Sequence, residues 1–485
     1  MNSEERIFSI IEEYSSPLNY SIPRISVILA AGHGKRIKSS TPKMLYEIWG
    51  VPSLIRVSRA AKKGLSSPNQ VIVVGIKANE VIKTVGKNEN TRFVYQEEQK
   101  GTGDAVRVAL ESIDKNFTGD IYIFPGDVGL ITEAVIRDLK EEFENSSYQM
   151  MLLTGQFEGK VKDNYYGRVI KEKTSGEVSE IKEYKDILAL KDVYKIVHEG
   201  NSLTFTKNEL LNIREFNSGI YAFRGKLLRD HIPLLKCDNI QGEYYLTDMV
   251  RIFNENELKV GSRMVRDSTA LLGFNDRVIL KRMESLARRN VYSQLKEIVT
   301  FQDPEDFFIA EEVVEDILEM DRRKILVDLE IGKGAHISKG VKLSRGVRIG
   351  KNSYLKGTII LEEGVNIGDR VQISTYPAQM LRIGKNTEIL SGDILKGNLQ
   401  IGSDSRIESW VRITGSDEYP VRIGSNVLIK GTTYIFGCKI DDGIFIEHCV
   451  LKRKHVKKKI TPNRKVQPLR YIFPEEEGIE CLEDL

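Results

Sequence analysis

The residues best suited to chemistry lie early in the chain, in the segment 25–43, which reads ISVILAAGHGKRIKSSTPK. Gly32 and Gly34 follow an apolar run and carry no side chain, so backbone N–H groups there can approach phosphate oxygens. Arg36 and Lys43 add positive charge that could neutralise a leaving pyrophosphate. The pattern predicts a cradle for nucleotide phosphates; the competing interpretation is a strand-to-helix turn with surface cations.

Asp127 is a second residue whose position suggests chemistry, because it ends the apolar run DIYIFPGD. Ligands of open α/β sheets bind beyond the carboxyl ends of the strands, where Gly32 and Asp127 would both lie. A carboxylate there could hold Mg²⁺, which takes few protein oxygens and fills its other positions with phosphate and water. The alternative is that Asp127 only caps its strand.

The elements that must position these residues alternate between strand and helix. Buried strands are expected at 26–31, 71–76, 92–96 and 120–127, and amphipathic helices at 51–64, 103–113 and 131–143. This alternation predicts parallel βαβ units with right-handed crossovers. From about residue 148 the pattern indicates a mixed, partly antiparallel sheet, followed by helices at 242–256 and 275–298.

An aliphatic residue returns at every sixth position through the last third of the chain. This period fits neither a helix nor a simple strand, and it is typical of a parallel β-helix in which three hexads form one triangular coil. We expect the aliphatic side chains to stack inward. They are Ile331, Ile337, Leu343, Ile349, Leu355, Leu361, Ile367, Ile373, Ile383, Ile389, Leu395, Ile401, Ile407, Ile413, Ile423, Ile429, Ile435, Ile440 and Ile446.

The segment LAAGHGKRIKSSTPK resembles the signature of the sugar-nucleotide pyrophosphorylases. Residues 25–290 are similar to the bacterial N-acetylglucosamine-1-phosphate uridyltransferases, the nucleotidyl half of a bifunctional enzyme of cell-wall precursor synthesis. The resemblance implies a UDP-N-acetylglucosamine diphosphorylase that uses UTP, a sugar 1-phosphate and Mg²⁺. The phosphate nucleophile is already ionised near pH 7, so such an enzyme would work by positioning and charge neutralisation.

The resemblance also assigns roles to individual residues. The expected catalytic cations are Arg36 and Lys43, and the expected Mg²⁺ ligands are Asp127 and Asn275. The expected nucleotide contacts are Leu29, Ala31, Gly32, Gly34, Gln96, Gln99, Gly101 and Thr102, with both glutamines facing uracil. The expected sugar contacts are Gly167, Glu183, Asn217, Tyr245 and Thr247. Without the resemblance, Glu183 could form a surface ion pair, Asn217 a turn and Tyr245 a core contact.

These patterns predict an α/β Rossmann-like nucleotidyltransferase domain followed by a left-handed parallel β-helix. The expected boundaries are an N-terminal extension at 1–24, the nucleotidyltransferase domain at 25–300, a helical linker at 301–326, the β-helix at 327–451 and a charged, weakly ordered tail at 452–485.

In the bifunctional relatives the β-helix is an acetyltransferase, which benefits from a histidine general base. The family's Gly-His-Leu-x-Tyr context is absent from this sequence, and no histidine occurs between His336 and His448. We expect both to be surface residues and the β-helix to lack acetyltransferase activity. Its remaining role would be assembly of a homotrimer.

Composition bounds the other possibilities. The net charge of +3 over 485 residues is too small to indicate a protein that binds nucleic acid through its overall charge. No apolar run is long enough for a membrane span. Four scattered cysteines and an acidic, non-apolar start indicate a cytoplasmic protein. Three alternatives remain open: another sugar 1-phosphate, a non-catalytic regulatory subunit of the same architecture, and an acyltransferase with a diverged site.

Overall fold

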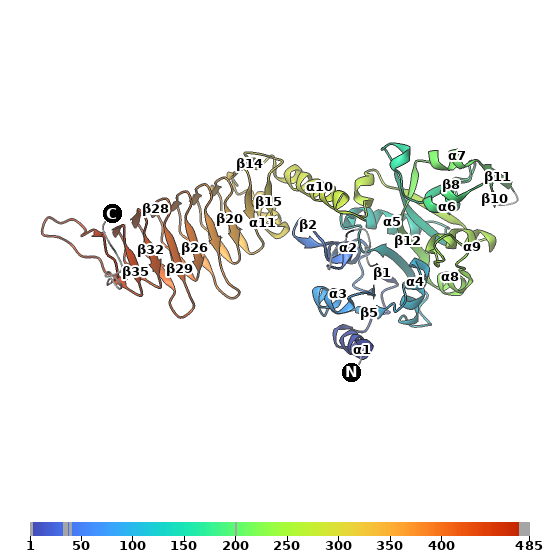
Figure 1. Cartoon of the computed structure of the whole chain (residues 1–485), viewed down its shortest axis with the longest axis horizontal. Coiled ribbons are helices and arrows are strands. Elements are labelled where there is room, and N and C mark those ends of the chain that lie inside the picture. The colour runs from blue at the N-terminus through green and yellow to red at the C-terminus, as the bar shows by residue number, and fades with distance from the viewer. Residues whose placement is uncertain (1–2, 33–36, 38–40, 199–200, 475–485) are drawn as a thin grey trace, which may run out of the picture. The chain divides into compact units, whose positions relative to one another are not determined.

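The computed structural model of the chain describes residues 3–32, 37, 41–198 and 201–474 (Figure 1). Two compact units, Met1–Glu284 and Ser285–Leu485, divide the chain. The predicted cradle residues Gly34 and Arg36 lie outside the described residues.

A nine-stranded mixed sheet forms the centre of the first unit. Its main order is β13-β7-β12-β6-β1-β4-β5, with β8 beside β12 and β9 beside β8. Strands β6, β1, β4 and β5 are parallel, as the βαβ pattern predicts, whereas β12 runs antiparallel to β6 and β7. The bounds are β1 (Arg24–Ala30), β4 (Gln70–Val74), β5 (Thr91–Tyr95), β6 (Asp120–Pro125), β7 (Met150–Gln156), β8 (Arg168–Lys171), β9 (Val178–Lys182), β12 (Glu215–Arg224) and β13 (Val260–Met264).

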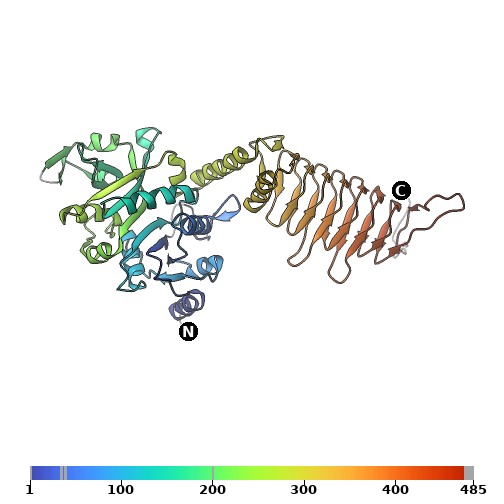
Figure 2. The ribbon, with the colours of Figure 1, turned by 180° about the vertical axis from the view of Figure 1, so that it is seen from behind.

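Helices cover both faces of this sheet (Figures 1 and 2). One core cluster joins the sheet to α2 (Ser53–Gly64), α3 (Ala78–Val85) and α5 (Glu133–Asn145). A second cluster on the other face joins it to α4 (Thr102–Glu111), α8 (Gly225–His231) and α9 (Met249–Glu255). Because successive side chains of a strand point to opposite faces, Val27 contributes to one cluster and Ile28 to the other. The unit is therefore a three-layer α/β domain.

The segment 1–24, expected as an extension, contains α1 (Ser3–Tyr14). Its apolar residues Ile7, Ile10 and Ile11 recur at helical spacing and pack against the first of these core clusters. The helix is thus attached to the domain by its own apolar face.

The predicted helix at 242–256 forms only in its second part. A short 3-10 turn at Leu246–Asp248 leads into α9, whereas Tyr244 lies outside any helix. Its backbone N–H donates to the carbonyl of Lys100 (2.7 Å), and its carbonyl accepts from Gly103 (2.8 Å). Because these backbone groups are used by a distant segment, they cannot also form a helical turn.

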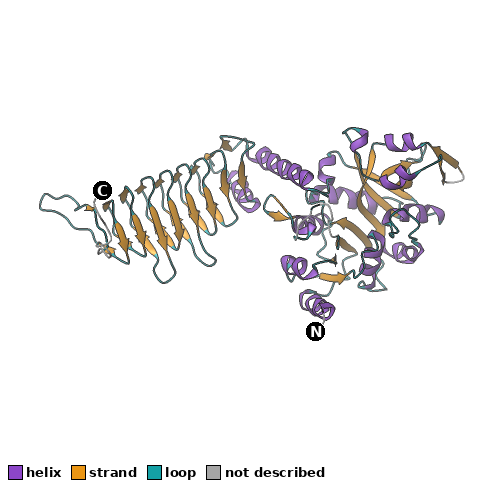
Figure 3. Cartoon of the chain, in the orientation of Figure 1, coloured by secondary structure: helices purple, strands orange, loops and turns teal. Residues whose placement is uncertain are grey.

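The second unit is built from three parallel sheets of short strands, coloured orange in Figure 3. Every predicted inward aliphatic residue is buried, from Ile331 to Ile446, so the hexapeptide prediction of a left-handed β-helix is confirmed. The first sheet consists, in order, of β14 (Val299–Phe301), β16 (Leu329–Ile331), β19 (Arg348–Ile349), β22 (Asn366–Ile367), β25 (Glu388–Ile389), β28 (Arg406–Ile407), β31 (Leu428–Lys430), β34 (Phe445–Glu447) and β37 (Leu469–Arg470). The second consists of β15 (Phe307–Ile309), β17 (Ala335–Ile337), β20 (Tyr354–Lys356), β23 (Gln372–Ser374), β26 (Ile394–Gly397), β29 (Arg412–Gly415), β32 (Tyr434–Phe436) and β35 (Val450–Lys452). The third consists of β18 (Val341–Leu343), β21 (Ile359–Leu361), β24 (Leu381–Ile383), β27 (Leu399–Ile401), β30 (Val421–Ile423), β33 (Lys439–Ile440) and β36 (His455–Val456). Partners in the same sheet, such as Ile331 and Ile349, lie one coil apart.

Both predicted boundaries of the β-helix differ from the observed elements. At the end of the expected nucleotidyltransferase domain, β14 (Val299–Phe301) already pairs with the first coil. In the expected linker, β15 (Phe307–Ile309) pairs with the same coil, and α11 (Glu311–Arg322) follows. In the expected tail, β36 (His455–Val456) and β37 (Leu469–Arg470) extend the stack after β35 (Val450–Lys452). The hexapeptide pattern is weaker in these strands, but backbone hydrogen bonds to the neighbouring strands still join them to the sheets.

None of the helices in the described residues is both long and apolar enough to cross a lipid bilayer.

Candidate nucleotidyltransferase site

Three polar side chains from distant parts of the chain converge beside the sheet. The Lys43 ammonium donates to the Asn275 amide oxygen at 2.7 Å and also to the Asp127 carboxylate. Lys43 is only 8% exposed, and its Nζ lies 5.7 Å from the centre of the Phe274 ring. Sequence reasoning named all three polar residues, and the structure brings them together.

Local backbone features place these groups. Asp127 follows β6 and lies beyond the carboxyl end of β1, whose Leu29 carbonyl accepts from the Gly126 N–H at 3.0 Å. A Cβ at Gly273 would lie 3.3 Å from the Asp127 carboxyl, so the absence of a side chain there gives the carboxylate room. The candidate site thus lies beyond the carboxyl ends of β1 and β6, where ligands of open α/β sheets bind.

The two predicted metal ligands fit a hard divalent cation. Both oxygens accept hydrogen bonds from one ammonium, so they already face a common positive group. No group of three or more histidine, cysteine or acidic side chains in the described part of the chain is arranged to hold a metal ion. One carboxylate and one amide are instead the sparse oxygen set that Mg²⁺ accepts when substrate phosphates and water complete its shell.

The predicted nucleotide contacts form a second group next to these residues. The Gln99 amide donates to the Ala31 carbonyl at 3.0 Å, which brings the two segments together. Gln96 is 3% exposed, and its amide donates to the carbonyl of Gly101 (3.2 Å) and to Asp104 (2.8 Å). Because its amide group is occupied, Gln96 holds the loop 96–101 in shape.

The loop that contains Gly101 and Thr102 packs against the segment around Tyr244. Gly101 has φ +109°, and a Cβ there would lie 2.6 Å from the Tyr244 carbonyl oxygen. The Thr102 hydroxyl accepts from the Leu246 N–H at 3.1 Å. Glycine is therefore required both by its backbone conformation and by the close approach. The contact links the predicted nucleotide loop to Tyr245 and Thr247.

Gly167, Glu183 and Asn217 form the predicted sugar group. The Asn217 N–H donates to the Gly167 carbonyl at 2.9 Å, and a Cβ at Gly167 would lie 2.9 Å from the Glu183 carboxylate. The Asn217 side chain donates to the Tyr221 hydroxyl at 2.7 Å. The surface-ion-pair interpretation of Glu183 does not hold among the described residues, because no such pair forms.

The environment of Glu183 favours its protonated form. Burial, and then the charges of Asp186 and Asp248, raise the pKa of its carboxyl to about 7. The charges of Asp186 and Glu183 also act on Tyr245. Burial is the main reason that the pKa of the Tyr245 hydroxyl rises to about 12, and this hydroxyl accepts a hydrogen bond from Gln241 at 2.7 Å. Thr247 is 7% exposed and lies in the middle of the 3-10 turn that leads into α9.

Sequence reasoning did not identify Arg168 and Tyr166, which hold in place the segment that contains Gly167. The fully buried guanidinium of Arg168 donates to the carbonyls of Asn164 and Tyr166 on the chain just before Gly167. Burial, and then the charge of Asp127, raise the pKa of the Tyr166 hydroxyl, which hydrogen-bonds the backbone of Gly273. The available signal was the adjacency of both residues to Gly167 in YYGR.

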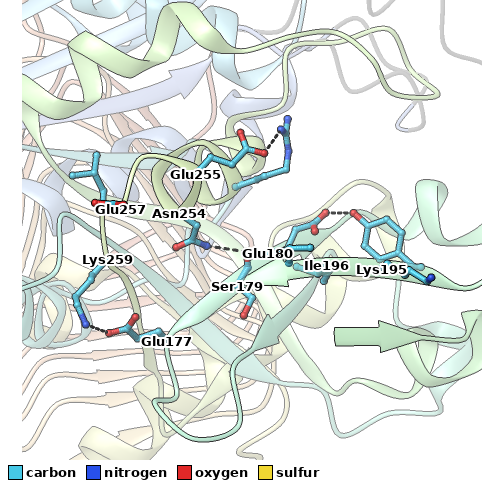
Figure 4. Close-up of a pocket in the computed structure, with 13 residues that line it drawn as sticks. Glu177, Ser179, Glu180, Lys195, Ile196, Asn254, Glu255, Glu257 and Lys259 are labelled. Atoms are coloured by element: carbon cyan, nitrogen blue, oxygen red, sulfur yellow. Dashed lines mark hydrogen bonds and ion pairs between the residues drawn. The ribbon is translucent and has the colours of Figure 1, made fainter. Parts of the chain in front are cut away.

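A separate cavity of about 790 Å³ lies between β9 and α9 (Figure 4). Three of its four acidic side chains have partners within the fold: Glu177 pairs with Lys259 (2.8 Å), Glu255 with Arg251 (2.9 Å), and Glu180 accepts from Tyr194. None of the described site residues lines it. The candidate site is therefore the polar convergence around Lys43 and not this cavity.

The histidines of the second unit are engaged by neighbouring side chains. His336 is stacked between Phe308 (4.4 Å between ring centres) and Tyr354 (4.6 Å), and burial lowers its pKa. His448 stacks on Tyr471 at 5.7 Å. The Nε2 of His455 lies 2.9 Å from the Asp441 carboxylate. Each ring thus has a structural partner.

Comparisons with known proteins agree with this architecture. Residues 26–188 match the family model of the MobA-like NTP transferase domain. The chain is 31% identical over 447 residues to the bifunctional protein GlmU of Streptococcus uberis (strain ATCC BAA-854 / 0140J), covering 86% of this chain and 90% of that protein. It is also 31% identical over 418 residues to the bifunctional protein GlmU of Clostridium botulinum (strain Loch Maree / Type A3), covering 84% and 79%.

Among solved structures, a UDP-glucose pyrophosphorylase complexed with UDP-glucose aligns with a TM-score of 0.42 and 12% identity, over 55% of this chain and 99% of that one. Because the alignment with the Streptococcus uberis protein covers 86% of this chain, it includes most of both units. The chain, a sugar-1-phosphate nucleotidyltransferase in type, therefore belongs to the GlmU family.

Proposed function

We propose that the first unit transfers the uridylyl group of UTP to N-acetylglucosamine 1-phosphate, giving UDP-N-acetylglucosamine and pyrophosphate. The observation that carries this proposal is the convergence of Lys43, Asp127 and Asn275 at the edge of the sheet. Such a group combines a cation for phosphate with oxygen ligands for Mg²⁺, which phosphoryl transfer requires.

The chemistry is a single in-line displacement. An ionised phosphate oxygen of the sugar 1-phosphate attacks the α-phosphorus of UTP, and the bond to the β-phosphate breaks as pyrophosphate leaves. Lys43 neutralises the phosphate charge, and Asp127 with Asn275 would hold Mg²⁺, which supplies further charge neutralisation when bound. Arg36 is proposed to contribute a second cation, and the N–H groups at Gly32 and Gly34 to bind phosphate oxygens.

Specificity is proposed to come from two loops in contact. The loop 96–102 would receive the base, with Gln96 and Gln99 facing uracil and Leu29 and Ala31 beside it. Gly167, Glu183, Asn217, Tyr245 and Thr247 would receive the sugar. The hydrogen bond from Leu246 to Thr102 supports this division, because it joins the two loops where base and sugar would meet.

Pyrophosphate release tests the proposal when it is measured over a grid of four nucleoside triphosphates and several sugar 1-phosphates with Mg²⁺. We expect turnover with UTP and N-acetylglucosamine 1-phosphate. Turnover with another sugar 1-phosphate in its place would change the assigned substrate. Silence across the whole grid would contradict catalysis and favour a regulatory subunit.

The second unit is proposed to lack acetyltransferase activity and to assemble three copies of the chain through its flat sheets. The stacking of His336 and His448 on aromatic rings supports the first part, and burial lowers the pKa of His336, which makes that ring a weaker base. Release of coenzyme A from acetyl-coenzyme A and glucosamine 1-phosphate would refute it. Light scattering tests the trimer, and a monomer in solution would refute that assignment.

We place this activity in the cytoplasm. The three described cysteines, Cys237, Cys438 and Cys449, are free thiols, in keeping with a reducing compartment.

A further inference from the structure

The terminal coil of the β-helix is strongly basic. Between residues 448 and 474 the sequence has nine lysine and arginine residues and no acidic residue. All nine cations are exposed, on β35 and β37, in the turn between β35 and β36, and on the hairpin between β36 and β37. They are Lys452, Arg453, Lys454, Lys457, Lys458, Lys459, Arg464, Lys465 and Arg470.

Few of these charges are compensated by the fold. Arg470 pairs with Glu447 at 2.9 Å, and Arg453 lies over the Tyr419 ring at 3.8 Å. The other seven form no ion pair within the described residues. Gathered like charges repel one another over roughly 8–10 Å at ordinary salt, so a fold gains nothing from this arrangement unless an anionic partner neutralises it.

The hairpin between β36 and β37 projects beyond the last coil (Figures 1 and 2). It is closed by a bridge between Ile460 and Val466 and by hydrogen bonds between Thr461 and Lys465. Edge strands often carry lysine to prevent pairing with other chains, which accounts for some of the cations. It does not account for the exposed apolar residues beside them.

Large apolar side chains are exposed on the same terminal coil. Ile460 is 53% exposed, and the residues just after β37 include Tyr471 (65%), Ile472 (43%) and Phe473 (61%). Cations beside aromatic and aliphatic groups are typical of surfaces that bind the headgroups of anionic lipids and insert shallowly among them. A nucleic acid would use the cations but offers no apolar phase for Ile460 and Ile472.

We propose that this terminal coil, residues 448–474, is a peripheral docking surface for an anionic lipid membrane. The cations contact lipid phosphates, and the apolar side chains enter the interfacial layer. The proposal is independent of the chemistry assigned to the first unit.

Cosedimentation of the full chain with vesicles tests the proposal. We expect binding to vesicles that contain phosphatidylglycerol as about a third of their lipid and little binding to phosphatidylcholine alone. Raising salt from about 0.05 to about 0.5 M should weaken it. Equal binding to both vesicles, or none to either, would overturn the proposal.

A matched pair of variants locates the contact. Replacing Lys457, Lys458, Lys459 and Lys465 by glutamine should lower partitioning by roughly 600-fold, since each cation near an anionic surface contributes about fivefold. A control with the same loss of charge replaces four exposed lysines of the first unit by glutamine, namely Lys83, Lys87, Lys115 and Lys236. Equal losses in both variants would overturn the assignment.

Two further measurements separate this proposal from its rivals. Phe473→Ser should weaken binding to vesicles and leave the thermal unfolding temperature unchanged, whereas unchanged vesicle binding would contradict apolar insertion. Single-stranded RNA should compete poorly with vesicles, and tight RNA binding that displaces the vesicles would favour nucleic acid instead.

The acidic residues that follow require their own test. Residues 475–485 lie outside the described structure and include six acidic side chains. A chain that ends at Pro474 should bind anionic vesicles more strongly, because negative charge is removed. Loss of binding on this truncation would overturn the proposal, since the contact would then lie in the removed segment.

Discussion

The two units place their side chains by opposite means. In the first, Lys43, Asp127 and Asn275 come from separate elements and meet at one point beside the sheet. In the second, equivalent residues of successive coils stack in columns, as in Ile337 and Leu355. Convergence concentrates charge in a small space, whereas repetition distributes the same contact along an axis. The polar convergence is thus a feature of the first unit, and regular packing is a feature of the second.

Buried polar groups follow the same division. In the β-helix, the Ser353 and Thr387 hydroxyls donate to carbonyls of the next coil, at Gly368 (2.7 Å) and Gly402 (2.8 Å). Asp393 is the exception, because it is fully buried and its Oδ2 has no hydrogen-bond partner among the described residues. The Ser353 and Thr387 hydroxyls therefore use their hydrogen-bonding capacity within the fold and not for a substrate.

The largest effect should come from Asp127→Asn in the first unit. Loss of the carboxylate removes a predicted metal ligand and the partner of Lys43, so kcat for pyrophosphate release should fall on the order of 100- to 1000-fold. The exposed Asp230→Asn on α8 is the matched control and should keep normal turnover. Turnover near that of the wild type in Asp127→Asn would refute the role of this carboxylate.

A truncation inside the β-helix should affect stability and leave nucleotidyl transfer unchanged. Ile401 is 1% exposed, and Ile401→Ala should lower the free energy of unfolding of the second unit by about 2–5 kcal/mol. Its neighbour Gln400 faces solvent, and Gln400→Ala should change stability by less than about 0.5 kcal/mol. Denaturant unfolding curves compare the stabilities of the two variants, and pyrophosphate release at low denaturant compares their activities. Loss of turnover in Ile401→Ala protein that is still folded would contradict the separation of stability and nucleotidyl transfer between the two units.

Asp393 gives the β-helix a pH dependence of stability. Burial raises the pKa of its carboxyl to about 8, whereas the unfolded chain releases this proton near pH 4. The folded state therefore holds the proton longer, and the free energy of unfolding should fall as pH rises from about 4 to about 8. Asp393→Asn should remove this contribution, roughly 3 to 4 kcal/mol between pH 5 and 8. Parallel pH profiles of the two proteins would contradict this account.

The smallest effect concerns sugar binding through Glu183. If its carboxylate accepts a sugar hydroxyl, KM for the sugar 1-phosphate should fall about tenfold from pH 6 to pH 8, because the pKa is about 7. Glu183→Gln should lose this part of the pH dependence while retaining the part that arises from the substrate phosphate. Identical KM profiles for both proteins would exclude Glu183 as the titrating group.

The β-helix was predictable from the sequence because every hexad has the same requirement, one apolar side chain that is buried inside the coil. Ile331 and its successors needed only a period and an apolar side chain to be assigned inward. The parallel strands around β1 were predictable for a similar reason, since their apolar runs are fully buried. Local patterns of this kind need no knowledge of distant contacts.

The candidate site was predictable only in part. The role of Lys43 came from its spacing after the glycines, while Asn275 was found only through resemblance. The turn at Tyr244 and the position of Arg168 depend on hydrogen bonds to distant backbone groups, to Lys100 in one case and to Leu211 in the other. No local pattern records such a contact, so both were missed.

We propose that the convergence of Lys43, Asp127 and Asn275 is the one catalytic centre among the described residues. The most direct measurement supplies the purified chain with UTP, acetyl-coenzyme A, Mg²⁺ and either N-acetylglucosamine 1-phosphate or glucosamine 1-phosphate, and separates the products by anion exchange. The account predicts UDP-N-acetylglucosamine from the first sugar alone, with no coenzyme A released from either mixture. Acetyl transfer to glucosamine 1-phosphate, or no nucleotide sugar from N-acetylglucosamine 1-phosphate, would contradict it.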